Sequence, residues 1–237
     1  MAHFDLEEQE KLAQIKHFWK QYGNLLTAVL VVVLLALAGW WGWKAWQNRQ
    51  ATQATALYEE LERIASNPGA DPDGARLTRA LADMKDRFPG TAQAQQAALQ
   101  VAALHAQAGL TQPARLEAAR AALQWLAEEG RDQGYRALAR LRLAGLLLDA
   151  KSYDAALAQL NTDFPAEFAA LAADRRGDIY LAQGKKAEAG AEYLKAWQGL
   201  EVQASQSGPG GNYRQVVDAK LAALGIQPAA ATPAEVR

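Results

Sequence analysis

The stretch "RGDIYLAQGKKAEAGAEYLKA", Arg176 to Ala196, has the pattern of a helix, a glycine turn and a second helix. A search for internal similarity aligns it with "LAGLLLDAKSYDAALAQL", Leu143 to Leu160, at an offset of 33 residues. Small residues share columns in this alignment, as Ala144 does with Gly177. A repeat of this period predicts stacked pairs of helices.

These columns resemble the tetratricopeptide repeat (TPR), a helix–turn–helix unit of about 34 residues. The chain departs from that pattern at Ala173, where the repeat has its first tryptophan. Small side chains at the helix crossing let two backbones approach, while larger apolar residues fill the flanks. We therefore predict packing or turn roles for Ala144, Ala156, Gly177, Tyr180, Gly184, Ala189, Tyr193 and Ala196.

The tripeptide Arg176-Gly177-Asp178 lies inside this repeat. In an extracellular protein it can be an adhesion signal, which requires Arg176 and Asp178 to be splayed at the tip of a loop. Consecutive side chains of a helix point in different directions and lie along a rigid rod. The pattern therefore predicts that Gly177 is a packing glycine and that the tripeptide is not an adhesion signal.

A second feature is the apolar run "LLTAVLVVVLLALAGWWGW", Leu25 to Trp43, in an interval without charge from Lys20 to Lys44. About 20 apolar residues suffice to cross the roughly 30 Å hydrocarbon core of a bilayer as a helix. Aromatic residues flank the run on both sides, as in spanning helices. They are Phe18, Trp19 and Tyr22 before it, and Trp40, Trp41, Trp43 and Trp46 at its end. We predict a transmembrane helix.

The alternative is a cleaved signal peptide, because Ala36-Leu37-Ala38 resembles a cleavage site. The 24 residues before the run contain four acids, and the run continues through tryptophans, so a retained anchor is favoured. Orientation is almost balanced by charge, since two basic residues flank each side at short range. Lys11 tips the count slightly toward an N-terminus on the inside.

The rest of the chain is rich in helix-forming residues and is broken by short turns. After the break at 206–212, an apolar face suits a helix that caps the last repeat. The predicted fold is all-α: one N-terminal transmembrane helix, a TPR-like α-solenoid and a C-terminal capping helix. The predicted boundaries are a short tail over 1–24, the transmembrane helix over 25–46, the repeat domain over 47–226 and a disordered tail over 227–237. The apolar face of the capping helix is predicted to comprise Tyr213, Val216, Val217, Leu221 and Leu224.

Composition excludes several functions. The chain has 25 basic and 26 acidic residues, so it lacks the basic excess that drives nucleic-acid binding. It has no cysteine for a disulfide or a thiolate nucleophile. No phosphate loop, HExxH motif or GxSxG motif is present. His105 falls at a packing position of the repeat. We therefore predict a non-enzyme with no catalytic residue, cofactor or metal.

What remains is protein binding, because helical repeats line a concave surface with the first helix of each unit. The repeat frame places six residues near that surface as candidates for partner binding: Leu138, Leu141, Leu148, Asp174, Asp178 and Leu181. In the alternative interpretation the leucines belong to the core. Asp174 and Asp178, which have Arg175 and Arg176 beside them, are then solvated surface charges.

The whole plan resembles the YfgM-like family, the ancillary subunit of the bacterial SecYEG translocon. The resemblance is carried by "FWKQYGN" (18–24), "GWWGWKAW" (39–46) and the repeat stretches 141–160 and 168–189. It implies a single-pass inner-membrane protein with its N-terminus in the cytoplasm and its repeats in the periplasm. It also implies binding to SecYEG together with a membrane-anchored periplasmic chaperone of the PpiD type, and transfer of emerging secreted proteins to periplasmic chaperones.

We therefore expect a non-catalytic, membrane-anchored adaptor of the secretion translocon, with unfolded or emerging secreted proteins among its partners. The alternative function is a cell-envelope coordinator, in which the same repeats bind the machinery of cell division or outer-membrane assembly.

Overall fold

A computed structural model describes residues 6–109, 111–207 and 212–228. Across these ranges the regular structure is helical, with no strand. The chain divides into two compact units, residues 1–52 and 53–237. The all-α prediction is confirmed. The predicted disordered tail falls mostly on residues 229–237, which lie outside the described ranges, as do residues 1–5 of the predicted cytoplasmic tail.

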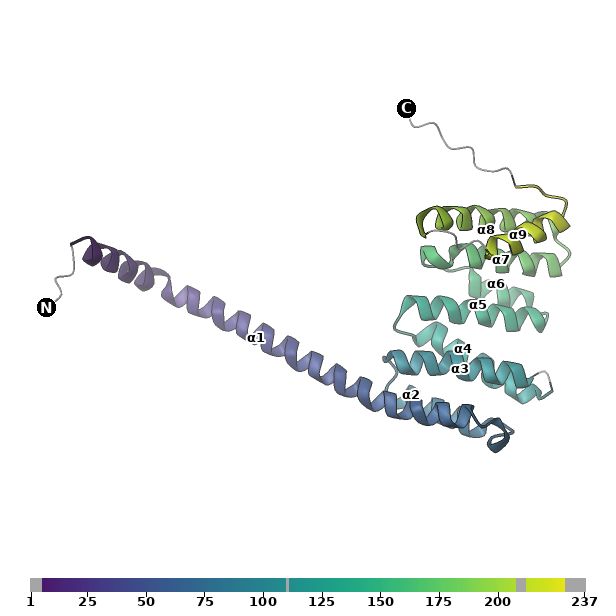
Figure 1. The fold of residues 1–237 in the computed structure, drawn as a ribbon, viewed down its shortest axis with the longest axis horizontal. Coiled ribbons are helices and arrows are strands. Elements are labelled where there is room, and N and C mark those ends of the chain that lie inside the picture. Colours follow the sequence, from purple (N-terminus) through teal and green to yellow (C-terminus); the bar gives the residue numbers. More distant parts are fainter. Residues whose placement is uncertain (1–5, 110, 208–211, 229–237) are drawn as a thin grey trace, which may run out of the picture. The chain divides into compact units, whose positions relative to one another are not determined.

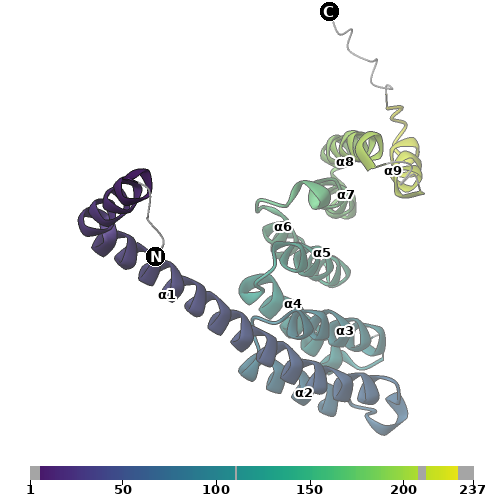
Figure 2. The same ribbon diagram turned by 60° about the vertical axis from the view of Figure 1, so that its left-hand side comes forward.

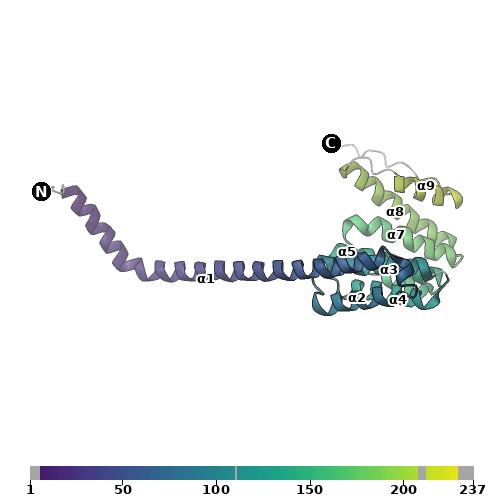
Figure 3. The same cartoon turned by 60° about the horizontal axis from the view of Figure 1, so that its bottom comes forward.

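Helix α1 runs from Leu6 to Ala65. Its residues up to Thr52 belong to the first unit, and its last residues, from Gln53, belong to the second unit. It contains an apolar stretch long enough to cross a membrane, and none of that stretch is buried. The hydroxyl of Thr27 donates to the carbonyl of Gly23 at 2.7 Å, a type of hydrogen bond that often bends helices. Figure 3 shows α1 bending within its purple N-terminal part.

The second unit stacks its helices in chain order (Figures 1 and 2). The last turns of α1 are followed by a short 3₁₀ helix, Pro68–Ala70, and by α2. Helix pairs α3/α4, α5/α6 and α7/α8 then form three repeats, and α9 packs against α8. The bounds are α2 Ala75–Arg87, α3 Ala92–Gly109, α4 Pro113–Glu129, α5 Gln133–Asp149, α6 Tyr153–Leu160, α7 Ala166–Ala182, α8 Lys186–Ser207 and α9 Asn212–Ala223.

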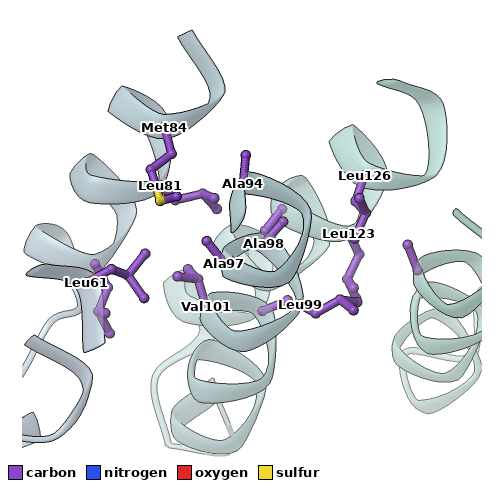
Figure 4. Packing of buried hydrophobic residues seen from close by; sticks show 14 of the residues in the cluster. Leu61, Leu81, Met84, Ala94, Ala97, Ala98, Leu99, Val101, Leu123 and Leu126 are labelled. Carbon is purple, nitrogen blue, oxygen red and sulfur yellow. The ribbon is translucent and has the colours of Figure 1, made fainter. Parts of the chain in front are cut away.

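The N-terminal half of this unit has an alanine-rich core (Figure 4). Leu61 of α1 and Met84 of α2 are fully buried against α3, which presents small residues such as Ala97 and Ala98. Leu126 closes the other side from α4. Each buried large apolar side chain contributes about 1.5–3 kcal/mol, and the alanines let the helices approach closely.

The turns of the last two repeats have the same geometry. Lys151 and Gly184 stand at equivalent positions and both adopt positive φ, 59° and 79°. At each turn two backbone N–H groups bond back to the preceding helix, at 2.8 Å for Lys151 to Leu148 and 2.9 Å for Gly184 to Leu181. The 33-residue offset read from the sequence is therefore a structural period in these two repeats.

Candidate protein-binding face

Gly177 lies in the middle of α7 and is buried against α8. A Cβ at this position would lie 2.5 Å from Cδ1 of Tyr193, which is closer than side chains approach. The missing side chain therefore makes room for the tyrosine ring. Its neighbours Arg176 and Asp178 belong to the same helix, and the tripeptide is not presented on a loop.

Most of the other predicted packing residues lie where the helices cross. Tyr180 is half-buried and packs against the last core cluster, while Gly184 supplies the positive-φ turn between α7 and α8. The remaining five have no exposed surface: Ala144, Ala156, Ala189, Tyr193 and Ala196.

The six candidate partner-binding residues do not share one environment. Leu141 is buried in a core with residues of α6 and α7. Leu138 and Leu148 are half-buried at the margins of two core clusters, and Leu181 is 40% exposed. Asp174 is only 1% exposed, and Asp178 is half-buried.

The two aspartates form the centre of a partly buried polar network between α7 and α9. Nζ of Lys220 lies 2.8 Å from each carboxylate oxygen of Asp174 and 2.7 Å from Oδ1 of Asp178. The hydroxyl of Tyr213 donates to Asp174 at 2.6 Å. Lys220 thus pairs with both carboxylates, and Nη1 of Arg175 lies 3.6 Å from Oδ2 of Asp178, which satisfies the requirement that buried charges be paired.

Two tyrosine hydroxyls complete the network as neutral donors. Tyr193 donates to Oδ1 of Asp178 at 2.9 Å. Burial, and then the hydrogen bond and negative charge of Asp178, raise the pKa of Tyr193. Burial and the hydrogen bond to Asp174 likewise raise the pKa of Tyr213. Both phenols therefore keep their protons and act as hydrogen-bond donors to the carboxylates.

The interpretation of the two aspartates as solvated surface charges is wrong for Asp174, whereas the half-buried Asp178 keeps part of its side chain in solvent. Asp174 is covered by α9, so its carboxylate is not available to a partner, and Leu141 is likewise enclosed. The role of Lys220 was not predicted, and Tyr213 was predicted only as part of the apolar face of the capping helix, not as a donor to Asp174. One signal was present: these residues are seven apart, and therefore share a face of the helix that was predicted to cap the last repeat.

Several residues of α5 and α7 remain at least partly accessible, and we call this set of residues the α5–α7 face. It combines half-buried or exposed leucines with two arginines. Arg175 of α7 reaches across α5, since a Cβ on Gly145 would lie 3.9 Å from its Cζ atom. Arg142 is exposed and donates to the carbonyl of Leu99 on α3 at 3.4 Å. The face comprises Leu138, Arg142, Leu148, Arg175 and Leu181.

The chemistry of the α5–α7 face suits a polypeptide. Leucines provide apolar contact, and the arginines have N–H donors for backbone carbonyls or carboxylates. Over the described ranges, no group of three or more His, Asp or Glu residues could hold a metal ion.

His105 has a structural environment elsewhere in the repeat domain. It is buried on α3, where Nδ1 accepts a hydrogen bond from Nε of Arg115 at 3.1 Å and Nε2 lies 3.0 Å from the hydroxyl of Thr78. Burial and the charge of Arg115 lower its pKa, an effect that Asp71 partly offsets. The ring is therefore a neutral member of a packed polar cluster, in agreement with the predicted packing role.

The architecture defines a class: a helical-repeat protein that, among the residues the structure describes, has one helix long and apolar enough to cross a membrane. The model of the tetratricopeptide repeat-like domain family matches residues 16–226. The chain is also 36% identical, over 191 residues, to the ancillary SecYEG translocon subunit of Neisseria gonorrhoeae; the match covers 81% of this chain and 88% of that protein.

No solved structure matches the chain. The chain belongs to the tetratricopeptide repeat-like family and, within it, to the family of the ancillary SecYEG translocon subunit. The family resemblance inferred from the sequence is therefore confirmed.

Proposed function

We propose that this chain is a non-catalytic, membrane-anchored adaptor of the bacterial secretion translocon. One observation carries the proposal: the similarity to the Neisseria gonorrhoeae ancillary SecYEG translocon subunit extends over most of both chains. The similarity thus includes more than a single repeat motif, which unrelated repeat proteins could share.

The proposed topology is a single pass through the inner membrane, with the N-terminus in the cytoplasm and the repeats in the periplasm. The apolar stretch of α1 supports the single pass. Protease treatment of spheroplasts tests the orientation. Residues after Trp46 should be digested from outside in intact spheroplasts, and protection of the repeat domain until lysis would contradict the topology.

The proposed contact surface is the α5–α7 face, through which the repeats link SecYEG to a periplasmic chaperone of the PpiD type and to emerging secreted proteins. Two observations support this surface: Leu181 and Arg142 are exposed, and Leu138 and Leu148 are half-buried. Arginine is enriched at the core of protein interfaces, and apolar area there supplies binding energy.

Affinity purification from mild detergent tests both parts of the proposal. The full chain should recover SecYEG subunits together with the chaperone, and a variant without the anchor should recover less of the translocon. Leu181→Asp with Arg142→Glu should lose the chaperone or client proteins. The matched control is Ala158→Glu, on an exposed position of α6 outside the face.

The possible outcomes separate the two functions. Recovery of division or outer-membrane assembly proteins without SecYEG would favour the cell-envelope coordinator. Recovery of cytoplasmic proteins alone would contradict both functions.

A further inference from the structure

A pocket of about 400 Å³ lies where the start of α5 meets the segment that joins α6 to α7. Arg136 and Arg140 line it from α5, and Thr162, Asp163 and Phe164 line it from the connecting segment. No residue of the α5–α7 face lines this pocket. It is therefore a separate feature of the repeat domain, and the proposed function does not use it.

The two guanidinium groups are held in place by neighbouring backbone and side chains. Nε of Arg136 donates to the carbonyl of Ala127 at 3.1 Å, and Nη1 of Arg140 donates to the hydroxyl of Thr162 at 2.7 Å. Gly130 makes room for Arg136, because a Cβ there would lie 2.9 Å from its Cγ atom. Each guanidinium has five N–H donors, so both retain donors for a ligand.

The arginines are like charges one turn apart on the same helix, an arrangement that repels. Within residues 6–109, 111–207 and 212–228, no carboxylate lies within 4.0 Å of either guanidinium as an ion-pair partner. Burial, and then the charge of Arg136, lower the pKa of Arg140. An anion placed between the two groups would relieve this repulsion.

We propose that this pocket binds a carboxylate side chain from an acidic polypeptide segment. Arginine presents a planar fork of donors that matches a carboxylate. With Asp163 at the pocket, the two cations leave a net charge of +1, which matches one carboxylate better than a doubly charged phosphate. Phe164 adds an apolar wall for a side chain next to the acidic residue.

The choice of a polypeptide as ligand rests on the proposed function, but the test needs no translocon. It uses the full chain, purified in mild detergent, and two synthetic peptides labelled with rhodamine. One is acetyl-Gly-Ala-Glu-Leu-Ala-Gly-amide, and the other has Gln in place of Glu. A failure of the adaptor role would leave these binding measurements unaffected, so the two proposals can fail independently.

Fluorescence anisotropy should show that the Glu peptide binds and that the Gln peptide binds about tenfold more weakly, as expected for loss of a charge-assisted hydrogen bond. Arg140→Gln should weaken binding of the Glu peptide by a similar factor. Arg131→Gln, which removes the same charge just before α5 and outside the pocket, should leave binding unchanged.

Asp163→Asn should strengthen binding of the Glu peptide about threefold, because it removes a negative charge from the pocket. A gain of this kind cannot result from misfolding. Equal binding of the two peptides, or equal effects of Arg140→Gln and Arg131→Gln, would overturn the proposal. So would displacement of the Glu peptide by millimolar inorganic phosphate, which would identify a general anion site.

Discussion

The repeats α5/α6 and α7/α8 share one frame, yet the same inner position carries opposite chemistry in the two. Leu141 and Asp174 are equivalent at the 33-residue offset, and both are buried. Leu141 packs with apolar residues such as Ala172 of the following repeat. Asp174 instead meets Lys220 of α9. The interface between the two repeats is thus apolar, whereas the interface of α7 with the capping helix α9 also contains ion pairs.

The same frame distributes volume differently across the helix crossing. In the earlier repeat, Ala144 of α5 belongs to a core with Leu160 of α6. In the later repeat, Gly177 of α7 faces the larger Tyr193 of α8. Tyr193 is larger than Leu160, and Gly177 is correspondingly smaller than Ala144. The hydroxyl of Tyr193 also donates a hydrogen bond to Asp178. Close packing is kept while a polar group is added.

The largest predicted effect comes from removing the ion pairs between α9 and α7. Lys220→Met removes the cation that pairs with Asp174, which is only 1% exposed, and leaves Arg175 as the ion-pair partner of Asp178. It should lower the free energy of unfolding by about 3 kcal/mol. Urea unfolding measures the loss, and hydrogen exchange should locate it in α7 and α9. Adding Asp174→Leu, which copies Leu141, should recover much of the stability. If the single variant is as stable as the wild type, the ion pairs of Lys220 do not stabilise the contact between α7 and α9.

The next effect concerns the helix crossing. Gly177→Ala copies Ala144 and should destabilise the domain by about 1–3 kcal/mol, because its Cβ overlaps the ring of Tyr193. The thermal midpoint of unfolding measures the change. In the double variant, Tyr193→Leu copies Leu160 and should reduce the loss due to Gly177→Ala. If Gly177→Ala is neutral in the wild-type background, the size match between glycine and tyrosine is not needed.

A smaller effect is expected at the two equivalent turns. Lys151 adopts a left-handed conformation that disfavours residues with a side chain, so Lys151→Gly should stabilise by about 0.5–1 kcal/mol. Gly184→Ala should destabilise the domain by about 1 kcal/mol for the same reason. No atom lies within 4 Å of the added Cβ, so the cost comes from the left-handed backbone conformation and not from a clash. Denaturation midpoints of the two variants should shift in opposite directions, and a shift in the same direction would rule out the shared turn geometry.

The smallest effect is the contribution of Glu192, in the later repeat, to the pH dependence of stability. Burial raises the pKa of Glu192, but hydrogen bonds from Lys195 and Arg176 more than offset it, and the net pKa is below the ordinary 4.5. Its stabilisation is therefore present above pH 4.5 and is lost as the pH falls through the lower folded value. Glu192→Gln, which copies Gln159, should flatten the acid limb of a stability–pH curve. An unchanged acid limb would show that Glu192 contributes nothing.

Much of the fold could be predicted from the sequence because its signals are local. The 33-residue offset, Gly184 and the apolar run of α1 each depend on neighbours in the chain. The packing role of Gly177 followed from the same pattern, since small residues at a fixed period mark helix crossings. These inferences needed no knowledge of distant contacts.

The environment of the two aspartates could not be predicted in this way. Asp174 meets Tyr213 and Lys220 across separations of 39 and 46 residues. The charge pattern alone favoured solvent exposure of the aspartates, because Arg175 and Arg176 lie between them in the sequence and buried carboxylates are rare. Only the position of α9 on α7 decides between exposure and burial. The same long-range packing separates the enclosed Leu141 from the exposed Leu181.

Site-specific photo-crosslinking in living cells tests the proposed function most directly. A photoreactive residue is placed at Leu181 on the α5–α7 face or, as the control, at Ala158 on the exposed side of α6. We expect position 181 to cross-link to a translocon subunit, the partner chaperone or a secreted protein, and position 158 to give none of these. Equal cross-links from both positions, or cytoplasmic partners alone, would contradict a periplasmic adaptor that binds through this face.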